Sequence, residues 1–352
     1  MNMNIKKASA SVLVALTILS ATGCGGNATK ETTNVSLGMK ALQESSYESA
    51  REHFYKAIEE NEDLQLAYRG LGMTFMNEGD YEAARDNFIL ALQSGKNSVG
   101  SLEVDISMYL ASAYSKLNEY EKAVETYSNV LELKKKNDEL YFLRGVAYLK
   151  LQETDKAIAD FDKTISLDSK NVTRYINVFT SLKQGGQEEK GREYINKALS
   201  FLGDNQGLQK GELYYYLGEY DSAIAELENL SESGDNVATL YMGKSYEALG
   251  DVNYAASLYE KYLKADEGNG EVYNQLGLCK LSMEDYKGAL ECFQKGIKLG
   301  GEQKLQELYF NEAVACEYNG DFATAKTKFN EYKKRYPNDE KAKREAEFLK
   351  SR

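Results

Sequence analysis

The chain has 352 residues, with 43 lysines and arginines against 55 aspartates and glutamates, which gives a formal net charge of −12. An acidic balance of this size argues against a nucleic-acid partner and against flat electrostatic binding to anionic lipid. Charged residues make up 28% of the sequence and hydrophobic residues 42%, and there is a single proline, so the composition fits a soluble and largely helical chain.

The N-terminal segment has the features of an export signal. Lys6 and Lys7 precede an apolar run at 8–20, which is too short to favour a membrane-spanning helix and is typical of a secretory signal peptide. The residues Ala-Thr-Gly at 21–23 then lead into Cys24. Small residues directly before a cysteine resemble the cleavage box of bacterial lipoproteins, in which the cysteine is lipid-modified and becomes the first residue of the mature chain.

This resemblance implies a lipoprotein signal peptide at 1–23, a lipidation site at Cys24 and a lipid-anchored tether at 24–33. Because several acyl chains hold a protein stably on a membrane, we expect the chain outside the cytoplasm, anchored to the bacterial cell membrane by its N-terminal lipid. The outer membrane is the alternative if the cell is Gram-negative. An ordinary signal peptide, cleaved after the same small residues with Cys24 incidental, is the other interpretation of this segment.

Beyond residue 34, small residues recur with a period near 34. Each is followed four positions later by a large apolar residue, as Ala50 is by Phe54 and Ala84 is by Phe88. A period of this length indicates a helical repeat array, in which one unit cannot bury its apolar face alone and neighbouring units stack. The column of small residues comprises Ala50, Ala84, Ala123, Ala157, Gly191, Ala223, Ala255, Ala289 and Ala325.

A second column of small residues lies upstream of the first in most periods. Turn signals such as Gly79-Asp80 and Gly250-Asp251 stand between the two columns. Each unit is therefore predicted to be a helix A, a tight turn and a helix B, whose small residues let the paired helices approach closely. The upstream column comprises Gly38, Gly72, Ala111, Gly145, Gly211, Gly243, Gly277 and Ala313.

The second unit carries the most complete pattern. It resembles the consensus of the tetratricopeptide repeat, with tyrosine in the place of tryptophan, at Tyr68, Leu71, Gly72, Phe75, Gly79, Asp80, Tyr81, Ala84, Phe88 and Ala91. The resemblance implies an all-α fold, a right-handed α-solenoid of about nine tetratricopeptide helix-turn-helix units with a C-terminal capping helix. Units 1–5 would form a block at 34–200, and units 6–9 with the C-terminal helix a block at 201–352.

The fifth and sixth units depart from the pattern. Phe179 stands where helix A should carry a small residue, and six glycines gather between 185 and 211. Because a glycine inside a helix costs about 1 kcal/mol relative to alanine, the local helix stability should dip here. The sequence therefore predicts a more mobile joint at 184–212 between two stiffer blocks.

No residue pattern indicates catalysis or metal binding. His53 is the only histidine, the cysteines at 279, 292 and 316 show no metal-binding spacing, and no glycine-rich phosphate loop is present. Cys279 and Cys316 are predicted to be small buried residues rather than disulfide partners, and Cys292 is predicted to be buried as well. We therefore expect no catalytic residue, no metal site and no cofactor.

The resemblance also implies that helix A lines a concave groove. Exposed positions of helix A carry a mixture of aromatic, methionine, asparagine and basic residues, which is the composition of an interaction surface. A plainer interpretation is that tyrosine, present 27 times, fills half-buried positions wherever it fits. The candidate groove residues are Arg69, Met73, Asn77, Tyr215, Tyr216, Tyr241, Lys244, Asn274, Phe310 and Asn311.

These features predict a membrane-anchored, non-catalytic scaffold or adaptor at the bacterial cell envelope. Its partner would be a protein or peptide held in the groove, and no nucleic acid. The alternative is a lipoprotein that binds a solute or a glycan, with the aromatic groove stacking on sugar rings. An enzyme is the least favoured class, because no pairing of a nucleophile with a base is readable.

Overall fold

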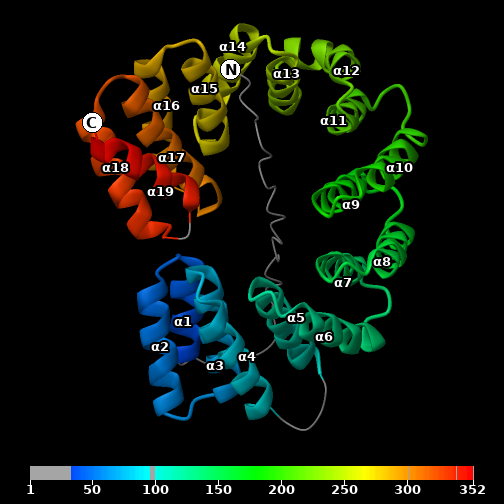
Figure 1. Ribbon diagram of the computed structural model, residues 1–352. Coiled ribbons are helices and arrows are strands. Elements are labelled where there is room, and N and C mark those ends of the chain that lie inside the picture. Colours follow the sequence, from blue (N-terminus) through cyan, green and yellow to red (C-terminus); the bar gives the residue numbers. More distant parts are fainter. Residues whose placement is uncertain (1–32, 96–99, 301, 338, 352) are drawn as a thin grey trace, which may run out of the picture. The chain divides into compact units, whose positions relative to one another are not determined.

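The computed structural model describes residues 33–95, 100–300, 302–337 and 339–351 (Figure 1). The predicted signal peptide at 1–23 and the predicted lipidation site Cys24 lie outside the described residues. Within the described ranges the chain forms nineteen α-helices, one short 3-10 helix and no β-strand. The predicted all-α fold class is confirmed.

The helices follow one another as nine pairs, with a single helix after the ninth. By their contacts they divide into two compact units, residues 33–191 and 192–351 of the described chain, and each unit is described by itself. The first unit contains α1 (Asn34–Gln43), α2 (Tyr47–Glu59), α3 (Leu64–Glu78), α4 (Tyr81–Ser94), α5 (Ser101–Lys116), α6 (Tyr120–Leu133), α7 (Asp138–Lys150), α8 (Thr154–Leu167), α9 (Val172–Gln184) and the start of α10 (Glu188–Leu199).

The second unit contains the rest of α10 and nine further α-helices. They are α11 (Gly207–Leu217), α12 (Tyr220–Glu232), α13 (Asn236–Leu249), α14 (Val252–Ala265), α15 (Gly270–Ser282), α16 (Tyr286–Leu299), α17 (Glu302–Tyr318), α18 (Phe322–Arg335) and α19 (Glu340–Phe348). The units meet in the sequence at Gly191 and Arg192, inside α10, while the block boundary predicted at 200–201 stays a prediction.

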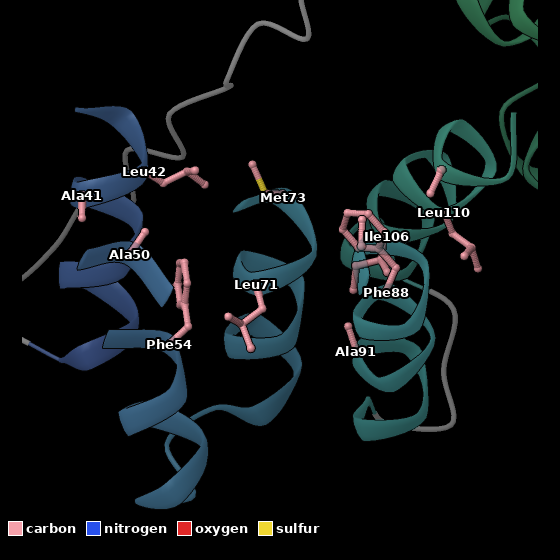
Figure 2. Close-up of a cluster of buried hydrophobic side chains, with 12 residues drawn as sticks. Ala41, Leu42, Ala50, Phe54, Leu71, Met73, Phe88, Ala91, Ile106 and Leu110 are labelled. Carbon is pink, nitrogen blue, oxygen red and sulfur yellow. The ribbon is translucent and has the colours of Figure 1, made fainter. Parts of the chain in front are cut away.

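A buried aromatic side chain can join one pair to the next, as Phe54 of α2 does in the core cluster of Figure 2. Phe54 is fully buried, and a Cβ atom added to Gly38 on α1 would come within 2.7 Å of its ring. A Cβ atom on Gly70 of α3 would come within 2.3 Å of the same ring. Only glycine leaves room for this ring on both sides, so the ring locks α2 against the helices before and after it.

The same contact recurs along both units. The alanines of the predicted column are fully buried, as Ala84, Ala157 and Ala289 are. The predicted roles of the two columns are thereby confirmed, since a small residue on helix A faces the large residue on helix B of its own pair. The further contacts of this kind are Gly72 with Phe88, Gly145 with Phe161, Gly211 with Leu227, Gly243 with Tyr259 and Gly277 with Phe293.

The fifth pair reverses the sizes of the two partners. Phe179 of α9 is only 1% exposed although it occupies the position of a small residue. A Cβ atom on Gly191 of α10 would lie 3.0 Å from the Phe179 ring. Helix B carries glycine here instead of alanine, and the lost methyl group makes room for the ring of helix A.

All nine turns inside the pairs contain one residue with a positive φ angle. Four of these residues are not glycine, namely Ser45, Asn118, Gln152 and Glu284, and the other five are Gly79, Gly186, Gly218, Gly250 and Gly320. In several turns an aspartate follows and caps helix B, as Asp80 does by accepting a hydrogen bond from the Ala83 amide at 3.0 Å.

The C-terminal helix α19 covers the end of the second unit. Ala342, Ala346 and Leu349 are buried in the hydrophobic cluster that includes Phe329 of α18. They close an apolar face that would otherwise meet water, which is the role predicted for a capping helix. Of the helices built from described residues, none has the length and hydropathy that a membrane span needs.

Candidate functional site

The first helices of neighbouring pairs touch one another directly. In the first unit α1 contacts α3, and α3 contacts α5. In the second unit α11 contacts α13, and α15 contacts α17, which lie side by side in Figure 1. We call the surface formed by these first helices the A-helix face, and it is the surface on which the sequence predicts a binding groove.

In the first unit, two of the candidate residues are placed differently from the prediction. The Arg69 Nε atom donates to Asp105 Oδ2 at 2.6 Å, and its guanidinium carbon lies 5.7 Å from the centre of the Tyr109 ring, so this cation is already paired. Met73 was predicted to be exposed, but it is only 8% exposed and belongs to the core cluster with Ile106. The prediction was wrong because α3 and α5 lie in contact and close the space around Met73. Asn77 is exposed.

In the second unit, the three candidate tyrosines come together. Tyr215 and Tyr216 on α11 and Tyr241 on α13 are half-buried, and we call them the tyrosine cluster. The centres of the Tyr215 and Tyr241 rings are 5.4 Å apart, those of Tyr215 and Tyr216 5.5 Å, and those of Tyr216 and Tyr241 6.3 Å. Burial raises the pKa of all three hydroxyl groups, so they stay neutral hydrogen-bonding groups at ordinary pH.

The sequence of α13 places polar residues on the same side of the helix as Tyr241 of this cluster. Asp235 caps the helix by accepting from the Ala238 amide at 2.8 Å, and Gly250 ends it in a left-handed conformation. Within these limits Tyr241, Lys244 and Glu247 follow at steps of three residues, which places them along one side of the helix.

Lys244 lies between an aromatic ring and a carboxylate. Its Nζ atom is 5.4 Å from the centre of the Tyr241 ring and donates to Glu271 Oε1 on α15 at 3.2 Å. The ammonium group is therefore held by a cation–π contact and by an ion pair at once. This arrangement joins α13 to α15 on the A-helix face.

Glu247 is tied to the core of the same pair. Tyr259 passes over Gly243, whose added Cβ atom would lie 2.7 Å from its ring, and its hydroxyl donates to Glu247 Oε2 at 2.7 Å. The Gln275 Nε2 atom donates to the same oxygen at 3.3 Å. Burial raises the pKa of Glu247, and these two hydrogen bonds and the charge of Lys244 oppose that rise.

Glu212 is a second carboxylate beside the tyrosine cluster. It lies on α11, one helical turn before Tyr215 and Tyr216. Burial raises its pKa, the negative charge of Asp235 raises it further, and Lys244 opposes the rise. Among the residues that the structure describes, neither Glu212 nor Glu247 forms an ion pair with a lysine or arginine.

Sequence reasoning missed Glu212, Glu247 and Glu271. Charged residues on solvated helices are common, so their composition gave no signal. The spacing of Glu212 did carry a signal. This residue stands three positions before Tyr215 and four before Tyr216, so it shares their side of the helix.

The remaining candidate residues of the second unit are buried or half-buried. Asn274 was predicted to be exposed, but it is 1% exposed, and its Oδ1 atom accepts from Asn311 Nδ2 at 2.8 Å. This bond fills the contact between α15 and α17, which explains the burial. The ring of Phe310 packs on Phe329 at 5.6 Å and on Tyr332 at 5.7 Å, so it faces α18 inside its own pair. Asn311 is half-buried.

The thiol groups of the second unit are buried and free. Burial raises the pKa of Cys292 and of Cys316 to about 11, and that of Cys279 to about 12, so these thiols stay protonated at neutral pH. Over the described ranges, no group of three or more histidine, cysteine, aspartate or glutamate residues gathers in a way that could hold a metal ion.

Comparison with known proteins identifies the repeats by sequence. A profile described as TPR repeat matches residues 111–152. Profiles described as tetratricopeptide repeat match residues 138–171, 208–272, 270–299 and 307–339. The matches extend into both compact units.

Individual relatives are distant. The BBSome complex member BBS4 of Bos taurus is 25% identical over 183 residues, which are 51% of this chain and 35% of that protein, so the match spans about a third of the relative. The structure of yeast Tom70 is similar with a TM-score of 0.51 at 21% identity, covering 81% of this chain and 64% of that one.

A tetratricopeptide repeat protein from Parabacteroides merdae has a TM-score of 0.47 at 18% identity, covering 72% of this chain and 98% of that one. At these identities, the likeness to Tom70 supports the fold alone. Together with the five sequence matches and the nine helix pairs, it leads to one conclusion: this chain is built from tetratricopeptide repeats.

Proposed function

We propose that the chain is a membrane-anchored, non-catalytic scaffold of the bacterial cell envelope that binds a protein or peptide on its A-helix face. The observation that carries this proposal is the tyrosine cluster with its carboxylates. Tyrosine is enriched at protein interfaces because it offers a large rigid ring with a polar end. Here three such rings come from two successive repeats and lie next to two carboxylates, Glu212 and Glu247, that form no ion pair among the described residues.

The repeat architecture supports a scaffold role. Stacked helix pairs present an extended surface whose length grows with the number of repeats, which suits the binding of another chain better than that of a small molecule. BBS4, which matches half of this chain, is by its name a member of a complex. The proposed anchor at Cys24 rests on the sequence around it.

A pulldown with the full chain from envelope extract tests this proposal. Tyr216→Ala should lose the retained protein, because it removes a ring from the cluster. The matched control is Tyr55→Ala on α2, which removes a tyrosine that is 49% exposed and lies away from the A-helix face. Equal retention by both variants would contradict the proposed site.

A thermal-shift screen with cell-wall fragments separates the second candidate function. A glycan-binding protein should gain melting temperature with such fragments, since an aromatic cluster next to carboxylates can also stack on sugar rings and accept their hydrogen bonds. Two results together would show that the scaffold proposal is wrong: fragments stabilise the parent chain but not Tyr216→Ala, and no protein is retained in the pulldown. Glycan binding would then be the function.

A further inference from the structure

We propose that the tyrosine cluster, with Glu212 and Glu247, binds the cationic side chain of a lysine or arginine in the partner. The inference rests on the proposed function, and it specifies the chemistry that the partner must carry. Four observations support it: the ring faces, the charge around them, the free hydrogen-bonding atoms and a cation already bound in this way.

The cation already bound is Lys244 of the chain itself. Its ammonium group lies 5.4 Å from the centre of the Tyr241 ring and 3.2 Å from Glu271 Oε1. The surface therefore holds a lysine side chain by one tyrosine ring and one carboxylate. The ring of Tyr215 and the carboxylates of Glu212 and Glu247 offer the same two elements again, and among the described residues no cation is paired with any of the three.

The charge balance of the cluster is negative. Three carboxylates, those of Glu212, Glu247 and Glu271, lie near enough to the tyrosines to act on them electrostatically, and Lys244 pairs with Glu271. The other two carboxylates have no ion pair within the described ranges, and their partial withdrawal from water raises the pKa of each. The ionised form of such a carboxylate is stabilised when a cation of the partner binds beside it, whereas an acidic ligand is repelled.

The cluster has oxygen atoms that can accept a further hydrogen bond from a donor. Both hydrogen bonds that Glu247 accepts go to Oε2, so within the described part of the chain Oε1 accepts none. The hydroxyl group of Tyr215 likewise makes no hydrogen bond there. An ammonium group brings three N–H donors and a guanidinium group five, and neither has an acceptor that would clash with these oxygens.

A displayed library of random peptides selected on the full chain tests the inference. We expect a lysine or arginine to recur in the selected sequences. In the peptides then synthesised with a fluorescent label, replacing that lysine by norleucine or that arginine by citrulline should weaken binding about tenfold, the size of one charge-assisted contact. Glu212→Gln and Glu247→Gln should each weaken the charged peptide by several-fold and leave the neutral analogue nearly unchanged.

Glu232→Gln is the matched control, because it removes an exposed carboxylate at the end of α12 without touching the cluster. Thermal melts of each variant establish that it is folded. Peptides that bind without a basic residue, or equally to parent and Glu212→Gln, would overturn this inference and leave the scaffold proposal standing. A library that yields no binder at all would remove both.

Discussion

The ionised carboxylate of Glu212 is disfavoured in the folded chain. Its carboxylate is partly buried beside Tyr216 and Tyr241, Asp235 adds a like charge, and among the described residues Lys244 is the one cation that acts on it. A raised pKa means that the folded state holds the proton more readily than the unfolded chain does. Stability contributed by this group is therefore lost as pH rises through the raised pKa, and it returns in acid.

We predict that Glu212→Gln raises the free energy of unfolding at neutral pH by at most about 1 kcal/mol, because solvent screening limits the effect of a partly exposed charge. The gain should shrink towards zero at a pH below the usual carboxyl pKa, where Glu212 is protonated in both states. Urea unfolding of parent and variant at the two pH values measures the difference. A gain that is equal at both would mean that charge is not the cause.

Cys24 carries the prediction for the membrane anchor. Cys24→Ser should release the protein from the membrane fraction or stop its maturation, because serine cannot take the thioether-linked lipid. Fractionation and the mass of the mature chain are the measurements. A serine variant that stays with the membrane at the parent's mass would show that the lipoprotein interpretation is wrong.

The residues of the A-helix face show where sequence reasoning reaches its limit. Tyr215, Tyr216 and Tyr241 could be predicted, because the repeat period places all three on helix A. Met73 and Asn274 could not, because their burial depends on contacts between neighbouring first helices. The period of one unit does not reveal which of its polar side chains the next unit covers.

At the scale of the helix pair, the size of two facing residues decides how closely the helices approach. Alanine or glycine on one helix meets a large side chain on the other, so the period of small residues predicts both helices and their register. The fifth pair keeps the rule with the partners exchanged, Phe179 against Gly191. The turns are less predictable, since Gln152 and Glu284 adopt positive φ angles at positions where the sequence has no glycine to indicate such a conformation.

Ala157 tests this packing. It is fully buried on α8, and its carbonyl oxygen would lie 3.3 Å from a Cβ atom on Gly145 of α7. Ala157→Leu should therefore overpack the contact and lower the free energy of unfolding by roughly 1–3 kcal/mol. Ala159→Leu is the control, since Ala159 is exposed on the same helix and leucine there should cost little. Equal effects of the two substitutions in chemical denaturation would contradict the register.

At the scale of the whole molecule, the array consists of two compact units whose sequences meet inside α10. In a linear repeat array each pair is stabilised mainly by its neighbours, so a weak pair lowers stability locally before it affects the rest. The segment from 184 to 212 includes α10, several glycines and the loop before α11. Nothing in the period of the repeats predicts how strongly the units are coupled there.

We predict that backbone amides at 184–212 exchange with solvent faster than those of the second pair, α3 and α4, and the eighth pair, α15 and α16. The decisive amides are the hydrogen-bonded ones of α10, because loop amides exchange fast in any case. Hydrogen exchange followed by mass spectrometry gives the comparison. If α10 is protected as well as α4 and α16, the mobile joint does not exist.

The ring of Phe54 between Gly38 and Gly70 also bears on how such a gene changes over time. Phe88 takes up the same position 34 residues later against Gly72, so the surface that one pair leaves open is much like the surface left by the pair before it. A recombination event that removes or duplicates one period therefore joins two surfaces that already match. Array length, and with it the number of side chains offered to a partner, can thus evolve in whole steps without redesign of the core.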